Sequence, residues 1–162
     1  MKIASKYIGL ITGILMVAAS LILFYPLHLP VTGSNQYIIL SLLTMGVLVS
    51  LVLYSKQPHE NTPTFKDYFT EGFKTFIVVV LIMAIYTFVF YKFNTQILET
   101  AIKESNELII KQGDKTPAEI EANAQKLRSI FMPMMITVTT IKFLIIGALV
   151  SVVGAGFLSQ KK

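Results

Sequence analysis

An apolar run of membrane-spanning length, from Phe131 to Leu158, is interrupted by a single charge at Lys142. About 20 apolar residues in a helix cross the roughly 30 Å hydrocarbon core of a bilayer. The composition points the same way, because 54% of the residues are hydrophobic, only 14% are charged and the mean hydropathy is +0.66. Soluble domains have about 25% charged residues. We therefore expect an all-α integral membrane protein.

Four apolar runs predict four transmembrane helices in a single membrane domain. The predicted spans cover residues 7–25, 37–54, 76–93 and 134–158. Turn-forming residues from Pro26 to Gln36 should end the first helix and reverse the chain, so that the first two spans form a helical hairpin. The small residues Val17-Ala18-Ala19 also allow a cleavable signal peptide. Because the apolar run continues to Tyr25, we favour a retained helix.

Phenylalanines recur at helical spacing between charged residues just before the third span. They are Phe65, Phe69, Phe73 and Phe76. This pattern predicts an amphipathic juxtamembrane helix whose phenylalanines anchor it to the membrane surface or, alternatively, contact a partner. Thr64 and Asp67 resemble a capping box, which predicts that the helix begins there. The helix should continue into the third span.

Residues 94–130 form the one long polar segment between apolar runs. An apolar stripe in its first half predicts a helix that continues out of the third span. Gly113-Asp114-Lys115 should end that helix, and Thr116 with Glu119 predicts that a second one begins. The second helix also carries an apolar stripe. We therefore expect an antiparallel helical hairpin outside the membrane, serving as a spacer or as a docking surface.

The lysines near the short loops predict the orientation of the chain in the membrane. With four spans, one side carries Lys2, Lys6, Lys56, Lys66, Lys74, Lys161 and Lys162. Basic residues of short loops favour the cytoplasmic side, so both termini should be cytoplasmic and the hairpin 94–130 periplasmic. This distribution accounts for the formal charge of +5. Nucleic acid is not an expected partner, because the chain has no basic run and no nucleic-acid-binding motif.

Two segments and the order of the spans carry a resemblance. The segments are PTFKDYFTEGFKTF, which contains Gly72, and FYKFNTQILE, which contains Tyr91 to Phe93. The whole chain resembles a family of small four-span membrane proteins of unknown function found mainly in Bacteroidetes-type bacteria. The resemblance implies a location in the bacterial inner membrane and no established activity. It assigns no catalytic or binding residue to any position of this chain.

Few residues are available for catalysis or for metal binding. The chain has two histidines, His28 and His59, and no cysteine. It contains no zinc-protease motif, glycine-rich phosphate loop or nucleophile elbow. We therefore expect a protein that is not an enzyme and that has no catalytic, cofactor or metal site.

Small residues in the first and last spans are candidates for close helix packing. Gly9 and Gly13 form a GxxxG motif, for which packing within the chain is the simplest explanation. In the last span, small or weakly polar residues share one helical face. They are Thr137, Thr140, Gly147, Ser151, Gly154 and Ala155. Lys142 lies on the opposite face, toward lipid or a partner.

Lys142 is the candidate functional or assembly residue, because a charge inside a membrane is costly. Its ammonium either extends to the outer interface or meets a carboxylate, a lipid phosphate or a carbonyl of another subunit. We expect a non-enzymatic accessory or scaffold protein that assembles through its last span and its hairpin, as a homo-oligomer or with another membrane protein. The alternative is a small oligomeric transporter or pore in which Lys142 lines a path for an anion.

Overall fold

The computed structural model describes residues 5–28, 36–59, 61–113 and 116–160. Within these ranges every regular element is an α-helix, which confirms that the described chain is all-α. The helices are α1 (Ser5–Phe24), α2 (Gln36–Ser55), α3 (Phe65–Phe93), α4 (Thr95–Gln112) and α5 (Pro117–Gln160). The predicted turn at 29–35 and the residues Lys2, Asp114, Lys115, Lys161 and Lys162 lie outside the described ranges.

Four of these helices, α1, α2, α3 and α5, are long and apolar enough to cross a membrane. The protein is therefore a multi-pass membrane protein by the length and composition of its helices. The chain divides into two units. The first, here called the bundle, comprises residues 1–83 and 140–162, and the second, the hairpin unit, comprises residues 84–139.

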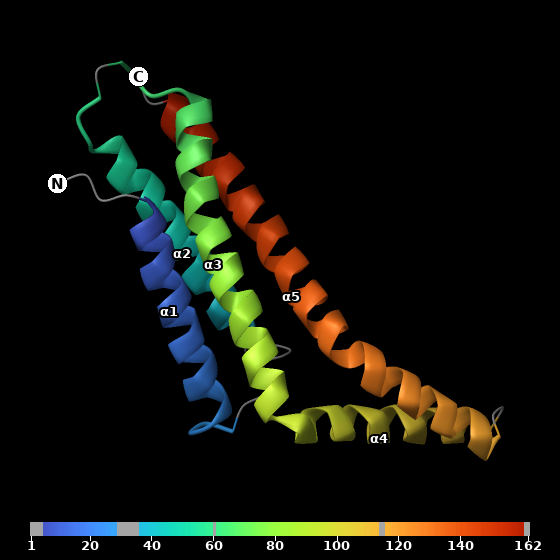
Figure 1. Cartoon of the computed structure of the whole chain (residues 1–162). Coiled ribbons are helices and arrows are strands. Elements are labelled where there is room, and N and C mark those ends of the chain that lie inside the picture. Colours follow the sequence, from blue (N-terminus) through green and yellow to red (C-terminus); the bar gives the residue numbers. More distant parts are fainter. Residues whose placement is uncertain (1–4, 29–35, 60, 114–115, 161–162) are drawn as a thin grey trace. The chain divides into compact units, whose positions relative to one another are not determined.

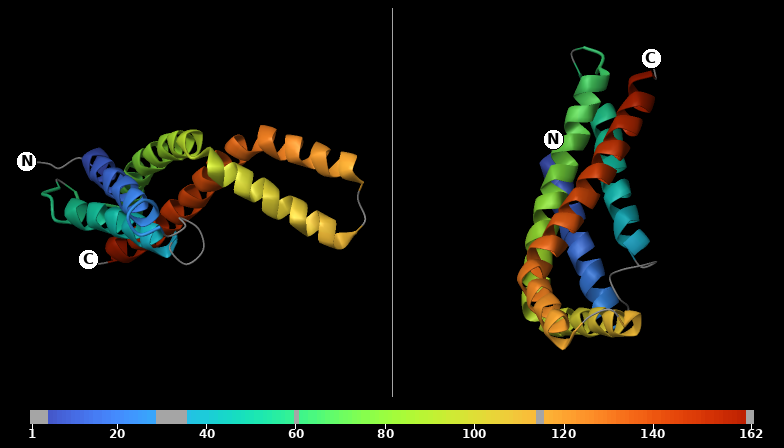
Figure 2. Two further views of the ribbon diagram at one scale, coloured as in Figure 1. Left: turned by 90° about the horizontal axis from the view of Figure 1, so that it is seen from below. Right: turned by 90° about the vertical axis from the view of Figure 1, so that its right-hand side faces the viewer.

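The bundle has an up-and-down arrangement. The start of α1, the end of α2, the start of α3 and the end of α5 lie at one end of it (Figures 1 and 2). α1 and α2 pack against each other as the predicted hairpin. Gly46 of α2 faces Thr12 of α1 so closely that a side chain at position 46 would collide with the threonine.

Glycines also bring the other bundle helices together. A Cβ atom at Gly13 of α1 would lie 2.6 Å from Ile82 of α3, and one at Gly147 of α5 would lie 2.6 Å from the Phe76 ring of α3. Gly154 of α5 lies equally close to α2, because a Cβ built at Gly154 would be 2.5 Å from the Leu51 side chain. Small residues permit such close approach of helices, and close packing drives helix association in a bilayer.

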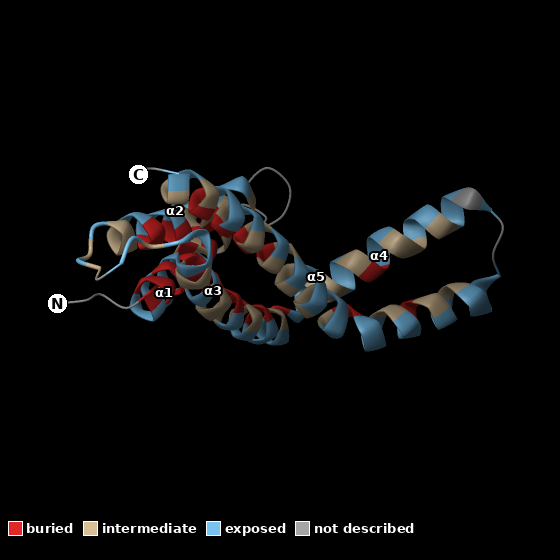
Figure 3. Cartoon of the chain, turned by 90° about the horizontal axis from the view of Figure 1, so that it is seen from above, coloured by how far each residue is buried: buried red, intermediate tan, exposed pale blue. Residues whose placement is uncertain are grey.

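Burial follows the helical period along each bundle helix (Figure 3). The interior contains large side chains that are almost completely buried, among them Met16, Leu43, Leu51, Phe76 and Val79. The outward faces expose aliphatic side chains, as expected for helices surrounded by lipid. The interior of the bundle is thus filled by side chains from four helices.

The hairpin unit contains α4 and the first part of α5, which run antiparallel (Figure 2). Arg128 of α5 forms an ion pair with Glu99 of α4 at 3.2 Å, and Asn123 donates a hydrogen bond to Ser105 at 3.3 Å. Ile102 and Ala124 are buried, with 5% and 2% exposure. The two apolar stripes are thus brought together as the antiparallel hairpin that was expected.

A helix follows the third span as expected, but it is separated from that span by a break, a point that the sequence had left open. α3 ends at Phe93, and Asn94 adopts φ −113° and ψ 59° before α4 begins. The buried Asn94 side chain donates to the carbonyl of Phe90 at 2.8 Å and accepts from Gln96 at 3.2 Å. Asparagine side chains compete with helical hydrogen bonds in this way. The break therefore occurs at the asparagine.

The second helix of the hairpin and the last span form one continuous helix. α5 runs from Pro117 to Gln160 and includes Pro133. Its start has the predicted capping geometry, because the Thr116 amide donates to the Glu119 carboxylate at 2.7 Å and the Glu119 amide donates to the Thr116 hydroxyl at 3.4 Å. Gly113, with φ 75°, ends α4 in the left-handed conformation that glycine adopts readily.

Candidate functional site

A cluster of polar side chains lies at the end of the bundle where α1 and α3 begin and α2 ends. Ser5 donates a hydrogen bond to one oxygen of the Glu71 carboxylate. Lys74 donates to the other oxygen at 2.6 Å. Glu71 is shielded from solvent, with 17% of its side chain exposed, whereas Lys74 has 54% exposed. The carboxylate is therefore fixed between α1 and its own helix.

One helical turn further, hydroxyl groups connect three helices. The Thr75 hydroxyl lies 2.6 Å from the Ser50 hydroxyl, 3.3 Å from the Ser5 carbonyl and 3.0 Å from the Glu71 carbonyl. Thr75 and Ser50 are almost fully buried, with 0% and 1% exposure. Burying a hydroxyl without a partner is costly, so these contacts fix the relative positions of α1, α2 and α3.

The local sequence explains how this cluster is positioned. The Asp67 carboxylate accepts hydrogen bonds from the Thr64 amide at 2.8 Å and from the Thr64 hydroxyl at 2.7 Å. These bonds lower the pKa of Asp67, first through the backbone amide and then through the hydroxyl. Because α3 begins at this cap, Glu71 and Thr75 follow on successive turns of one face. Gly9 allows α1 to approach, since its built Cβ would lie 2.5 Å from the Thr75 carbonyl.

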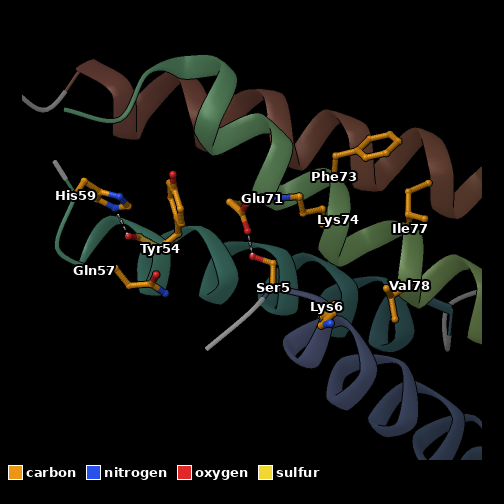
Figure 4. A pocket seen from close by; sticks show the side chains of 10 residues that line it. All are labelled: Ser5, Lys6, Tyr54, Gln57, His59, Glu71, Phe73, Lys74, Ile77 and Val78. Carbon is orange, nitrogen blue, oxygen red and sulfur yellow. Dashed lines mark hydrogen bonds and ion pairs between the residues drawn. The ribbon is translucent and has the colours of Figure 1, made fainter. Parts of the chain in front are cut away.

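Beside this cluster lies a pocket of about 690 Å³ (Figure 4). Its lining combines charged, polar and apolar side chains from α1, α2, α3 and the segment after α2. These residues are Ser5, Lys6, Tyr54, Gln57, His59, Glu71, Phe73, Lys74, Ile77 and Val78. The His59 ring lies against Tyr54, with 4.6 Å between ring centroids, and its Nε2 is 2.9 Å from the Tyr54 carbonyl oxygen. Tyr54 thereby positions the segment that follows α2.

This pocket was not predicted from the sequence. The signal available was a set of hydroxyl residues, including Ser50 and Thr75, at positions facing inward in otherwise apolar helices. Glu71 follows the same face of α3, but the sequence alone also allowed it to lie in solvent on an amphipathic helix. Only the packing of α1 against α3 brings Ser5 to Glu71.

Lys142 lies in the apolar part of α5 and is partly exposed. At about 100° per residue, it is roughly 150° from the middle of the buried stripe of α5 in the bundle. That stripe comprises Phe143, Gly147, Ser151, Gly154 and Ala155. The ammonium lies 5.2 Å from the centroid of the Phe143 ring. In the described part of the chain, no carboxylate forms an ion pair with it.

The predicted small residues of α1, and those of α5 from Gly147 onward, lie in the bundle interior. Gly9 and Gly13 of α1 face α3, while Gly147, Ser151, Gly154 and Ala155 of α5 are buried. Thr137, expected on the same packing face, is exposed. The small residues predicted for the packing face of the last span are therefore buried from Gly147 onward, whereas Thr140 is only partly buried.

The phenylalanines expected at the membrane surface have different environments. Phe65 and Phe73 are exposed, with 45% and 44% exposure, and Phe69 is intermediate. Phe76 has 1% exposure and packs at Gly147, so its expected role as a surface anchor was wrong. The periodic pattern places Phe76 next to the others, but α5 covers this turn of α3.

The described residues contain no group of three or more histidine, aspartate or glutamate side chains placed to hold a metal ion. His59 is engaged with Tyr54, and His28 is exposed with φ 52°. The pocket lining presents charged and hydrogen-bonding side chains, among them Lys6, Lys74 and Glu71.

Comparison with known proteins identifies the family. A family model described as a protein of unknown function (DUF4199) matches residues 7–160. Neither the curated proteins nor the solved structures contain a match to the chain. The matched residues include all four apolar helices and the hairpin unit. The chain therefore belongs to the DUF4199 family.

Proposed function

We propose that this protein is a non-enzymatic accessory or scaffold subunit of a membrane assembly, which it joins through its last span and its hairpin. The observation that carries this proposal is the environment of Lys142. Its charge lies on the outward face of α5 and has no carboxylate partner within the described chain. An intramembrane lysine without a partner is costly unless it reaches the interface or pairs with another group.

The composition of the spans favours a partner of a different kind over a second copy. None of the predicted spans 7–25, 37–54, 76–93 and 134–158 contains aspartate or glutamate. A second copy therefore offers no carboxylate inside the membrane. A different membrane protein with an acidic residue at the depth of Lys142 provides the missing charge, and a homo-oligomer would have to use a carbonyl or a lipid phosphate.

The surface around Lys142 suits helix contact. Leu149 and Val153, which share its side of α5, have 59% and 55% exposure. Gly156 lies on the same side, and a Cβ built there meets no atom within 4 Å. A glycine beside exposed aliphatic side chains leaves room for the backbone of a second helix.

The hairpin unit offers a second surface outside the predicted spans. Leu108 and Ile110 near the end of α4 have 61% and 63% exposure. Because they are two positions apart, they project from different sides of α4. We propose that a partner also contacts one of these sides of α4.

Co-purification in mild detergent tests the proposal. We expect Lys142→Leu to lose a specific membrane protein that the wild type retains, and Lys142→Arg to keep it. Lys126→Leu is the matched control, because it removes an exposed lysine of the same helix outside the apolar run. Equal retention of every partner by the wild type and Lys142→Leu would refute a role of Lys142 in assembly.

The alternative function is a small oligomeric transporter or pore. Within one bundle, contacts such as Gly13 with Ile82 and Gly147 with Phe76 close the interior. A path would therefore have to run between copies and be lined by Lys142. Liposomes loaded with a chloride-sensitive dye separate the two functions. Chloride flux that requires Lys142 would favour the transporter, and the scaffold proposal predicts no flux above that of empty liposomes.

We further propose a location in the bacterial inner membrane, with both termini in the cytoplasm and the hairpin in the periplasm. The lysines at the termini and in the α2–α3 segment support this orientation. The resemblance to bacterial four-span proteins supports the choice of membrane.

A further inference from the structure

We propose that the pocket at the end of the bundle binds an anionic phospholipid, with the phosphodiester held by Lys6 and Lys74 and an acyl chain lying along Ile77 and Val78. This inference is independent of the proposed assembly function, because the pocket lies on α1, α2 and α3 and does not include Lys142.

The pocket lies where three helices change from polar to apolar sequence. Lys6 directly precedes the first apolar run, Tyr54 ends the second, and Lys74 lies just before the third begins at Phe76. Aromatic and basic residues at such a boundary occupy the head-group region of a bilayer. A ligand bound here would have its polar part beside the lysines and its apolar part within the membrane.

The net charge of the residues that line the pocket favours a ligand with one negative charge. Its lining contains two lysines and one glutamate, which together leave one positive charge. The Glu71 carboxylate is already occupied by Ser5 and Lys74. Lys6 has no carboxylate partner in the described chain and lies 5.4 Å from the Tyr7 ring centroid. A phosphodiester with an otherwise uncharged head group supplies the single negative charge.

The arrangement of polar and apolar residues in the lining favours a lipid over a soluble phosphate compound as the ligand. In Figure 4, Tyr54 and Gln57 lie toward one side of the pocket and Ile77 and Val78 toward the other, with Glu71, Lys6 and Lys74 between them. Ile77 and Val78 follow Lys74 on the next turn of α3. A volume of about 690 Å³ is within the roughly 300–1,000 Å³ usual for small-molecule sites. Leu81 follows Ile77 by one turn of α3 and has 60% exposure, so an acyl chain can leave the pocket along this side of the helix.

Lipid titration with native mass spectrometry tests this inference. Purified protein in detergent is titrated with dioleoylphosphatidylglycerol, with dioleoylphosphatidylcholine and with soluble glycerophosphoglycerol. We expect the first to bind most tightly. Equal binding of the phosphatidylcholine would overturn the anionic preference, and equally tight binding of glycerophosphoglycerol would show that the acyl chain plays no part.

Paired variants locate the site. Lys6→Gln with Lys74→Gln should weaken phosphatidylglycerol binding by roughly fivefold for each lysine, from the attraction of a basic side chain to anionic lipid. Lys56→Gln with Lys66→Gln is the control, because it removes the same charge from exposed positions near the pocket but outside its lining. Equal weakening by both pairs would refute a specific site and indicate attraction by net charge.

A third variant keeps the test informative if the lysine pair fails to fold. Val78→Ser leaves all charges in place and makes the apolar wall polar. It should weaken binding of phosphatidylglycerol and leave binding of glycerophosphoglycerol unchanged. Unchanged lipid binding in this variant would overturn the assignment of the acyl chain to Ile77 and Val78.

Discussion

The contacts between bundle helices depend on the size of individual residues and on single hydrogen bonds. Glycines lie where bundle helices approach closely, and hydroxyl groups lie at helix contacts as well, some of them directly against a glycine, as Thr12 does at Gly46. Thr75 and Ser50 illustrate the second case, with 2.6 Å between their oxygens in the bundle interior. Hydrogen bonds between membrane helices contribute about 0.6 kcal/mol on average. Such contacts therefore specify position more than they add stability.

Substitution of two glycines in α5 should have opposite effects. Gly147→Ala places a new Cβ 2.6 Å from the Phe76 ring, at the point where the ring is attached to the Cβ of Phe76. The ring cannot easily move away from this point. Overpacking of this kind costs about 1–3 kcal/mol. Gly156→Ala meets no atom within 4 Å and should stabilise the helix by up to about 1 kcal/mol.

Thermal unfolding in detergent measures both glycine variants against the wild type. We expect a lower midpoint for Gly147→Ala and an equal or higher one for Gly156→Ala. A higher midpoint for Gly147→Ala would contradict the packing of α5 against α3.

The cap of α3 should depend on pH through Asp67. Its pKa is lowered by the hydrogen bonds from Thr64. A lowered pKa means that the stabilising contribution is complete above the ordinary value of about 3.9 and is lost as the pH falls through the lowered value. The wild type should therefore be more stable than Asp67→Asn at pH 7, and the difference should disappear at strongly acidic pH. Denaturation of both proteins over a pH series measures this difference in stability. A difference that stays constant with pH would exclude the Asp67 carboxylate as its source.

At the scale of elements, helix ends decide how the two units are built. The capping box at Thr116 begins α5, glycine at position 113 ends α4, and Asn94 separates α3 from α4. The Arg128 guanidinium lies beside Glu99, which raises the pKa of Arg128. This pair is exposed, so it adds little to stability and mainly sets which residues of α4 and α5 are opposite each other.

The stability of the hairpin unit should depend on its buried aliphatic side chains. Ile102→Ala removes a side chain with 5% exposure and should cost about 2–5 kcal/mol. Ile110→Ala, on the same helix with 63% exposure, should change stability by less than about 0.5 kcal/mol.

Hydrogen exchange followed by mass spectrometry measures this difference locally. In Ile102→Ala we expect faster exchange in α4 and unchanged exchange in α1 and α2. Faster exchange throughout the bundle would contradict the division of the chain into two units.

At the scale of the whole molecule, the arrangement of the helices places the start of α1 and the end of α5 at the same end of the bundle (Figure 1). With the proposed orientation, a fluorescent protein fused after Lys162 should fluoresce in the cytoplasm. Alkaline phosphatase inserted at Gly113 should be active, because that enzyme requires export. Activity of the phosphatase at the C-terminus instead would reverse the orientation.

The sequence by itself determined the membrane class, four of the helices and several of their ends. An apolar run of spanning length is expected to form a helix, because every backbone hydrogen bond must be satisfied within the membrane. The caps at Thr64 and Thr116 are equally local, since each depends on two residues three positions apart. The antiparallel hairpin followed from its two apolar stripes and the glycine between them.

Only the tertiary structure decided which residues of those helices meet. Phe65 and Phe76 share one periodic pattern, yet Phe76 is buried because α5 covers its turn of α3. Ser5 and Glu71 are 66 positions apart, and nothing local indicates their contact. The pocket exists because α1, α2 and α3 converge at one end of the bundle. Helical periodicity defines the faces of a helix, whereas the pairing of faces depends on close packing between segments that are distant in sequence.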